Sequence, residues 1–468
     1  MAPDRSDTGL THVRYLRDST WLRTGDERRL VLGGSPFRLF RLTVAGGRIV
    51  DRVERGESVD RSTLVDRLVE TGAVHPLPSP SERWSVGDVT IVTPRLGGAA
   101  TDDGRITVDD GSLPPIPGAT TRLPTNLGPA AARNAGRRLV DTEFIAFVDA
   151  DVDLDVNVDM NPDTDADSDA DSDVDADRGA RDAAPSRSPR VSWLEPLLAH
   201  FDDPRVGLVA PRVLGGRHTS LDLGAEPARI RVGTRVSYVP AAAIVVRAAA
   251  FDDVGGFDET LRFGEDVDFV WRLDAAGWTC RYEPGSTVWH EPRPDRIGRL
   301  RQQVGYGSSA APLALRHPTA LAPLRSDGLL TSTWVLGALG HPVLGAACAI
   351  AGAAGVRRKL PGVPTPVALR LAGKAQIATG RQVATAIRRV WWPFVVPLAV
   401  MSRRARLVAL ASVLADPTAL PTDLAYGWGV WRGMRGRRTL RPAVPKIGTR
   451  TGRSGADGFS GSGPDRRS

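Results

Sequence analysis

Two acidic clusters, far apart in the sequence, have the residue types and spacing to act on a phosphate-bearing substrate. Asp149 and Asp151 follow the apolar run 144–148, and Glu265 and Asp266 come much later in the chain. Side chains two residues apart on a strand point to the same side, so Asp149 and Asp151 can face one hard cation. Because Mg²⁺ bridges protein carboxylates to substrate phosphates, these two residues predict a divalent cation held against a phosphate group.

Asp266 has a second role open to it, because it stands where a helix is expected to begin. A carboxylate there could accept the proton of an incoming hydroxyl group, provided that it reaches within ~3 Å of it. The alternative is structural, since acidic residues such as Glu265, Asp266 and Asp268 offset the dipole of a helix in its first turn. A diphosphate leaving group held by a cation, together with one general base, is sufficient to transfer a sugar from a nucleotide donor.

Several motifs, in the right order along the chain, resemble those of the inverting family 2 glycosyltransferases. They are specific as a set and weak singly, and they occupy residues 126–136, 147–151, 255–273, 276–278 and 288–292. More narrowly, the whole chain is similar to the glycosyltransferases of mycofactocin biosynthesis in actinobacteria, with further cues at residues 32–39 and 236–247. The resemblance implies a metal-dependent hexosyltransferase with the GT-A type of nucleotide-sugar-binding fold.

The resemblance also implies a nucleotide pocket at the ends of two strands. Asp109 or Asp110 would contact the base and the ribose, and Arg133 and Asn134 would lie near the same pocket. Asp149 would contact the nucleotide as well. The alternative for Asp110 is a plain turn, which an Asp followed by a Gly favours.

The cation and the reacting groups are assigned by the same resemblance. Asp149 and Asp151 would hold a Mg²⁺ or Mn²⁺ ion with the diphosphate, and His290 would complete the metal shell or touch the diphosphate. A lone histidine after a strand is otherwise ordinary. Asp266 is expected to be the general base, with Glu265 orienting the acceptor. The acceptor oxygen would attack the anomeric carbon from the face opposite the diphosphate, which inverts that centre.

The resemblance implies UDP-glucose as the donor and a peptide-derived redox cofactor of the mycofactocin type as the acceptor. Two alternatives stay open. A transferase for cell-wall glycan or a polyprenyl phosphate at the inner membrane fits the apolar C-terminal segments. An inactive, peptide-binding scaffold of the same fold fits two departures from the family's pattern, which concern the connection after the first strand and an acidic tract.

An α/β fold is expected for residues 86–300, because β-branched runs alternate there with amphipathic segments. Ligands of such sheets bind beyond the carboxyl ends of the strands, where the candidate aspartates are expected. Residues 95–105 leave little room for the helix that family members carry after their first strand. Residues 152–190 are expected to be a disordered acidic insertion, because such a density of like charge cannot pack.

Residues 1–85 are expected to form a small winged-helix-like domain. A hairpin at Gly33 and Gly34 precedes two amphipathic helices near residues 45–55 and 62–71. That order is similar to the peptide-recognition domains found beside enzymes that mature ribosomal peptides. A small packing domain with no ligand of its own is an equal alternative.

Residues 301–434 are expected to be helical and to associate with a membrane. Residues 333–356 are almost free of charge and approach the ~20 residues that span a bilayer. Residues 390–401 are too few to span and suit an interfacial helix. A soluble helical bundle explains the same residues. From residue 435 to residue 468 a disordered basic tail is expected.

The amino-acid composition limits the classes of partner that this chain is expected to bind. Its 468 residues carry a formal net charge of +7 with a pI near 9.9, so an anionic partner is expected. No helix-turn-helix, zinc-finger or aromatic RNA-binding motif accompanies the basic residues, so the inner leaflet of a membrane is favoured over nucleic acid. Two cysteines, Cys280 and Cys348, and a polar N-terminus predict a cytoplasmic protein at the inner face of the membrane.

Overall fold

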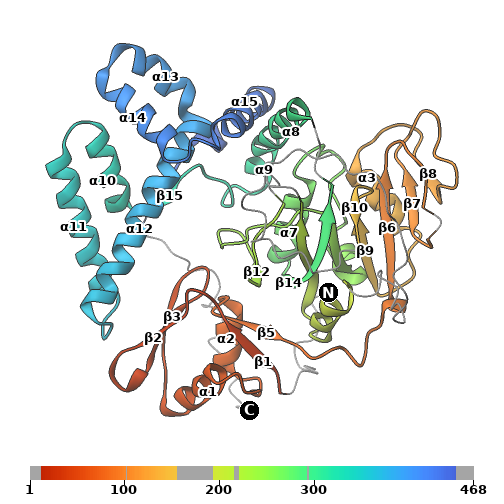
Figure 1. Ribbon diagram of the computed structural model, residues 1–468, viewed down its shortest axis with the longest axis horizontal. Coiled ribbons are helices and arrows are strands. Elements are labelled where there is room, and N and C mark those ends of the chain that lie inside the picture. Colours follow the sequence, from red (N-terminus) through yellow and green to blue (C-terminus); the bar gives the residue numbers. More distant parts are fainter. Residues whose placement is uncertain (1–11, 102, 155–192, 216–220, 292–294, 449–468) are drawn as a thin grey trace, which may run out of the picture.

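The structure is a computed structural model that describes residues 12–101, 103–154, 193–215, 221–291 and 295–448. Figure 1 shows three parts, which are an N-terminal unit, a sheet domain and a region of helices that extends away from the sheet. The expected acidic insertion at residues 152–190 lies outside the described residues from residue 155 onward.

A nine-stranded mixed sheet forms the centre of the sheet domain, so the predicted α/β fold is confirmed. The strand order is β10-β14-β11-β13-β9-β6-β7-β8, and β12 pairs with β14. β9, β6, β7 and β8 are parallel neighbours, β11 is parallel to β14, and β13 is antiparallel to both β11 and β9. The strands are β6 (Val89–Arg95), β7 (Ile106–Asp109), β8 (Thr121–Arg122), β9 (Phe144–Val148), β10 (Val152–Asp153), β11 (Val206–Leu214), β12 (Ala228–Ile230), β13 (Ala243–Arg247) and β14 (Thr279–His290).

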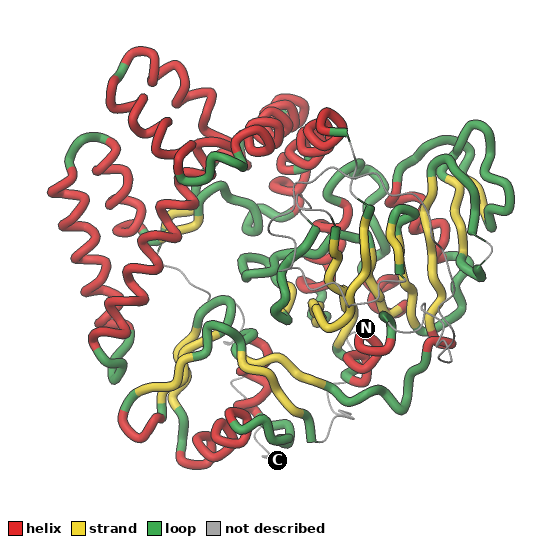
Figure 2. The backbone as a smooth tube through the Cα atoms, in the orientation of Figure 1, coloured by secondary structure: helices red, strands yellow, loops and turns green. Residues whose placement is uncertain are grey.

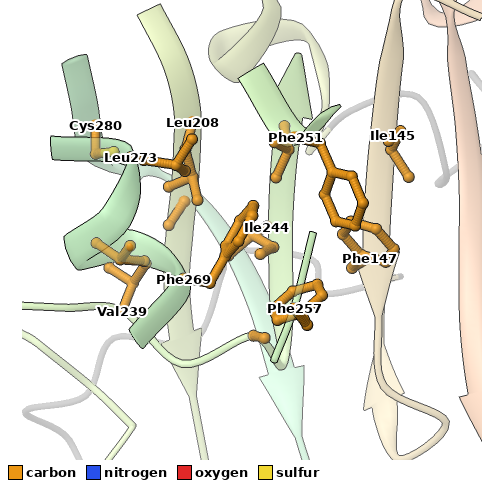
Figure 3. Packing of buried hydrophobic residues seen from close by; sticks show 14 of the residues in the cluster. Ile145, Phe147, Leu208, Val239, Ile244, Phe251, Phe257, Phe269, Leu273 and Cys280 are labelled. Atoms are coloured by element: carbon orange, nitrogen blue, oxygen red, sulfur yellow. The ribbon is translucent and has the colours of Figure 1, made fainter. Parts of the chain in front are cut away.

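Apolar side chains cover both faces of the sheet, because every residue of β9 is buried. Ile145 and Phe147 pack with residues of α3 (Pro129–Arg137), α6 (Ala248–Asp253) and α7 (Glu265–Ala275). Phe144 and Val148 pack on the other face with α5 (Glu195–Leu198) and the short helix η3 (Ala199–Asp202). A continuous apolar run that is buried on both sides is typical of a central strand. Figure 3 shows the first of these two clusters around Phe147.

The connection from β6 to β7 contains no helix within its described residues, as its length predicts. β6 and β7 nevertheless pair in parallel, from Val92 opposite Ile106 to Arg95 opposite Asp109. Turns take the place of the helix, and the Gly97 amide donates a hydrogen bond to the Ser112 hydroxyl at 2.8 Å. The short connection is therefore compatible with a complete parallel pair.

The N-terminal unit has the predicted hairpin followed by two helices. A three-stranded sheet, β2-β3-β4, and a strand pair, β1-β5, pack against the helices. Thr43 and Ser62 cap the two helices by accepting hydrogen bonds from backbone amides of the first turns. The elements are β1 (Arg14–Arg17), β2 (Leu22–Thr24), η1 (Asp26–Arg28), β3 (Leu30–Gly33), β4 (Arg38–Arg41), α1 (Val44–Glu54), α2 (Thr63–Glu70), β5 (Val74–Leu77) and η2 (Val86–Asp88). Peptide recognition by this unit stays a prediction.

The C-terminal region is helical, as predicted, and Figure 2 shows that helices make up nearly all of it. Two short strands, β15 and β16, pair in parallel at its base. The elements are α8 (Arg296–Ser308), α9 (Ala310–Arg316), β15 (Arg325–Ser326), α10 (Gly328–Ala338), α11 (Pro342–Lys359), α12 (Thr365–Ala386), the π-helical turn η4 (Ile387–Trp391), α13 (Trp392–Met401), α14 (Arg403–Leu414), α15 (Leu420–Arg437), η5 (Arg441–Ala443) and β16 (Lys446–Ile447).

The apolar residues 333–356 are divided between α10 and α11, because Gly340 has a left-handed φ of +86° and Pro342 starts α11. One expectation for this region needs correction. The basic tail does not begin at residue 435, since α15 continues to Arg437 and β16 pairs with β15. Residues 449–468 lie outside the described part of the chain.

One helix of the described residues is long and apolar enough to cross a membrane by length and composition alone. It joins α12, η4 and α13 from Thr365 to Met401, and only 22% of its most apolar window is buried. A single helix of this kind is weak support for a membrane span, because core helices of other proteins have the same length and composition. Residues 390–401 thus continue a longer helix and do not form a separate short one.

The helical region is joined to the sheet domain through α8, α9 and α15. Ala310 and Ala311 of α9 pack against Val430 and Met434 of α15. α8 and α15 approach so closely that a side chain at Gly307 would collide with the backbone of α15. These contacts place the start of the helical region beside the helix that carries the second acidic cluster.

Candidate active site

A buried arginine connects the two acidic clusters that the sequence singled out. Arg133, on α3, is only 2% exposed. Its Nη2 donates a hydrogen bond to Asp149 Oδ1 at 2.6 Å, and its Nη1 donates one to Glu265 Oε1 at 3.1 Å. A further bond from Nη2 to the Ala241 carbonyl at 3.3 Å fixes the guanidinium between α7 and β13. The end of β9 and the start of α7 therefore meet at one cation of the protein itself.

The start of α7 is shaped by a glycine. Gly264 has a left-handed φ of +79° and precedes Glu265, the first residue of the helix. A Cβ at this glycine would lie 2.9 Å from Ser309, at the start of α9, so the chain leaves no room for a side chain. This turn places Glu265 and Asp266 in the first turn of α7, where the helix dipole favours negative charge.

Asp266 has the protonation behaviour that a general base needs. Burial, reinforced by the neighbouring charge of Glu265, raises the pKa of Asp266 to about 7. The amides of Val267 and Ala241 and the charge of Arg133 act in the opposite direction. Its carboxyl group lies deep among other side chains, while the residue as a whole keeps a partly exposed surface. A base whose pKa is near the working pH transfers protons most effectively.

Asp268, two residues later, has a purely structural role, which was the alternative considered for the acidic residues at the start of α7. It is 1% exposed, accepts a hydrogen bond from Arg272 Nε at 2.7 Å and pairs with His317 Nε2 at 2.8 Å. Although burial opposes them, the hydrogen bonds from His317 and Arg272 lower the pKa of Asp268. Asp268 therefore stays ionised within an ion-pair network that joins α7 to the residue after α9. Asp266, by contrast, has no salt bridge within 4.0 Å among the described residues.

Asp151 and His290 lie side by side, because Val152 of β10 pairs with His290 of β14. His290 Nε2 is 3.4 Å from Asp151 Oδ2. Asp149, the other expected metal ligand, instead turns one oxygen toward Arg133. Within the described ranges, no group of three His, Cys, Asp or Glu side chains is arranged to hold a metal. One carboxylate and one imidazole fit a divalent cation whose remaining ligands are substrate phosphates and water.

Asp109 and Asp110 organise the loops at the carboxyl ends of the strands. Asp109 is fully buried and accepts hydrogen bonds from the Ser112 amide at 2.8 Å and from Arg122 Nε at 3.1 Å. Asp110 accepts hydrogen bonds from the amides just before α3, including the Gly128 amide at 2.9 Å. Both carboxylates thus satisfy backbone donors of the pocket wall, and their direct contact with a nucleotide stays a prediction.

Asn134 fixes the loop that leads to α7. Its side-chain oxygen accepts a hydrogen bond from the Phe257 amide at 3.0 Å, and its nitrogen donates to the Phe257 carbonyl and to Glu259 Oε1, both at 2.9 Å. Gly256 makes this contact possible, because a Cβ there would lie 2.7 Å from Asn134 Oδ1. Asn134 therefore positions the loop, and its expected place beside the nucleotide is not demonstrated by these contacts.

Tyr238 is a site residue that sequence reasoning missed. It lies in the segment before β13, keeps 42% of its surface exposed, and stands close enough to Asp266 that burial and the charge of Asp266 raise its pKa. Tyr306 of α8 and Tyr426 of α15 act in the same direction, and Arg389 of η4 acts against them. Groups of the C-terminal helices thus lie near Tyr238. Tyr238 itself stands in the stretch 236–247, but no local motif links it to residues of such distant segments.

Comparison with known proteins gives one relative of nearly full length. A pre-mycofactocin glycosyltransferase of Mycobacterium tuberculosis is 36% identical over 484 aligned positions, which cover 90% of this chain and 94% of that protein. An N-acetylglucosaminyl-diphospho-decaprenol L-rhamnosyltransferase of the same organism is 34% identical over 23% of this chain and 40% of its own length. No protein-family model matches the chain.

Among solved structures, a mannosyltransferase of Pyrobaculum calidifontis in complex with GDP-Man and Mn²⁺ aligns with 77% of this chain and 90% of its own, at 14% identity and a TM-score of 0.40. A truncated TarS protein of S. aureus aligns with 50% of this chain and 66% of its own, at 13% identity and a TM-score of 0.32.

Proposed function

Because this chain belongs to the family of the pre-mycofactocin glycosyltransferases, within the inverting family 2 enzymes, we propose that it transfers glucose from UDP-glucose to a peptide-derived redox cofactor of the mycofactocin type. The observation that carries the proposal is the contact of Arg133 with both Asp149 and Glu265. It brings the expected donor-binding strand end and the expected base-bearing helix together at one point.

In the proposed reaction Asp266 is the general base. Ionised, it accepts the proton of the acceptor hydroxyl while the acceptor oxygen attacks the anomeric carbon from the face opposite the diphosphate. Glu265, held by Arg133 at 3.1 Å, orients the acceptor and keeps the pKa of Asp266 raised through its own charge. One displacement inverts the anomeric centre, so no covalent enzyme intermediate is required.

The cation site is proposed at Asp151 and His290. These two side chains would hold a Mg²⁺ or Mn²⁺ ion against the diphosphate, where it would offset the charge that develops on the leaving group. Asp149 is assigned to the nucleotide side, because its carboxylate is oriented by Arg133. Asp109, Asp110 and the loops that they order would form the wall around the base and the ribose.

The decisive experiment measures UDP release by the full-length protein with UDP-glucose, Mn²⁺ and purified mycofactocin precursor. The proposal expects release that depends on the precursor, with a β-linked glucose in the product seen by NMR. Release with a polyprenyl phosphate but not with the precursor would favour the lipid-directed alternative. UDP-glucose binding without release under any of these conditions would favour the inactive scaffold.

Association with a membrane surface is proposed for α10 to α14. Val343 on α11 is 80% exposed, and Val400 and Met401 at the end of α13 are 78% and 87% exposed. Arg403 and Arg404 begin α14, one residue after Met401. Exposed apolar side chains beside arginines suit the boundary between headgroups and acyl chains of anionic lipid. This would place the protein in the cytoplasm at the inner face of the membrane.

Flotation with vesicles of anionic phosphatidylglycerol or neutral phosphatidylcholine tests this placement. Binding to the anionic vesicles is expected, and the double substitution Val400→Ser and Met401→Ser should reduce it. Equal recovery of both proteins in the unbound fraction would exclude the lipid contact. Because glucose transfer is measured separately, its outcome does not depend on this result.

A further inference from the structure

A small, partly open cavity lies between the N-terminal unit and the sheet domain, with about 30 Å³ of room for water-sized groups. Its polar lining combines residues of both parts, namely Tyr15, Arg61 and Asp66 from the N-terminal unit and His200, Asp203, Arg205 and Arg281 from the sheet domain. No role in glycosyl transfer was assigned to any of them.

The charges in this cavity are paired, with one exception. Arg61 Nε lies 2.8 Å from Asp66 Oδ1, and Arg205 holds Asp203 through two hydrogen bonds of 3.0 and 2.7 Å. Arg281, on β14, is 6% exposed, yet no carboxylate lies within 4.0 Å of its guanidinium among the described residues. Arg281 is thus the arginine of this lining that has no carboxylate partner within that distance.

A buried charge without a partner is unfavourable, and chains rarely keep one for packing alone. Burial, opposed by the charge of Asp203, lowers the pKa of Arg281 to about 10, so the side chain stays charged at neutral pH. The Tyr15 hydroxyl lines the same cavity and likewise has no hydrogen bond to the described residues. A cation and a neutral donor thus face one space from the two sides of the interface.

We propose that this cavity is a binding site for one small oxyanion, a carboxylate or a phosphate monoester, received by the Arg281 guanidinium and the Tyr15 hydroxyl. The two oxygens of a carboxylate or phosphate match the planar fork of an arginine. Because Tyr15 lies on β1 and Arg281 on β14, the bound group bridges the N-terminal unit and the sheet domain. The inference does not depend on glycosyl transfer.

The test is thermal unfolding of the full-length protein in acetate or inorganic phosphate, with chloride exchanged at constant ionic strength. Saturable stabilisation of about 2 °C or more is expected for the wild type. A larger response to acetate at equal concentration identifies a carboxylate site, and a larger response to phosphate identifies a phosphate site. If neither anion shifts the midpoint of the wild type, the proposal is wrong.

Variants separate binding from packing. Arg281→Met should abolish the response and, without anions, leave the midpoint unchanged or raised, because it removes an unpaired buried charge. Arg281→Lys should retain a weakened response. Arg212 lies on β11, the strand beside β14, and is paired with Asp222. The control Arg212→Met should respond to anions like the wild type.

If Arg281→Met does not fold, Tyr15→Phe provides a second test of the anion site, because it removes only a hydroxyl group. The proposal expects it to raise several-fold the anion concentration that gives half of the maximal stabilisation. An Arg281→Met or Tyr15→Phe variant that responds to anions like the wild type would overturn the site.

Discussion

Replacing Asp266 by asparagine should remove activity and, at the same time, stabilise the folded protein in a pH-dependent way. The base is lost, so kcat should fall by about 10²–10⁴ while UDP-glucose binding persists. The stability effect follows from the raised pKa. Between the unfolded value near 4 and the folded value of about 7, the folded state binds more protons than the unfolded state. The wild type therefore loses free energy of unfolding as the pH rises through this window.

The magnitude can be worked out for two pH values. From pH 5.5 to pH 8 the wild type loses about 2 kcal/mol, of which about 1.6 kcal/mol is lost below pH 7, where the slope falls from about 1.4 kcal/mol per pH unit to half of that. Asp266→Asn carries no titrating group. Its free energy of unfolding relative to the wild type should thus be about 2 kcal/mol more favourable at pH 8 than at pH 5.5.

Urea unfolding at both pH values, with UDP release measured on the same preparations, tests this reasoning. Asp268→Asn is the matched control, because Asp268 is ionised throughout this range and paired with Arg272 and His317. It should be less stable than the wild type at both pH values, since the Arg272 cation loses its buried partner. If Asp266→Asn shows the same difference from the wild type at pH 5.5 and pH 8, the raised pKa is refuted.

Further expectations concern activity, metal and backbone. The kcat/KM of the wild type should rise with pH through about 7 and level off above it, as Asp266 ionises, and UDP release from pH 5.5 to 8.5 records this. Treatment with EDTA should stop UDP release, and Asp151→Asn or His290→Ala should raise the Mn²⁺ concentration for half-maximal rate by about tenfold or more. Gly264→Ala should lower stability by about 1 kcal/mol more than Gly277→Ala, because both positions have positive φ but only Gly264 is crowded, by Ser309. Denaturant midpoints that coincide for the two alanine variants would contradict the crowding.

The sequence predicted the sheet well because its signals are local. β9 coincides with the apolar run 144–148, and the helices near residues 45–55 and 62–71 lie where their apolar periodicity indicates. The break between α10 and α11 is local as well, because Gly340 and Pro342 interrupt the apolar residues 333–356. Composition describes what a segment can bury, whereas backbone geometry decides where it turns.

The candidate site was only partly predictable for a different reason. Order along the chain and resemblance pointed to Asp149, Glu265 and Asp266, but not to the guanidinium of Arg133 as the group that joins them. Tyr238 lies in the stretch 236–247 that the resemblance marked, but its place beside Asp266 was not visible, because other neighbours come from α8 and α15. Contacts between segments that are distant in sequence leave no spacing pattern, so they become visible only once the fold is known.

Because Gly264 packs against Ser309, truncating the chain at residue 300 would disturb the start of α7. A shortened protein that ended there would keep every strand of the sheet, yet it would lose the surface that shields the carboxyl of Asp266 from water. Contact with water would lower the pKa of Asp266 toward its ordinary value, so the carboxylate would bind a proton less strongly at neutral pH. The helices after residue 300 thus shape the surroundings of Asp266, whatever they also contact elsewhere.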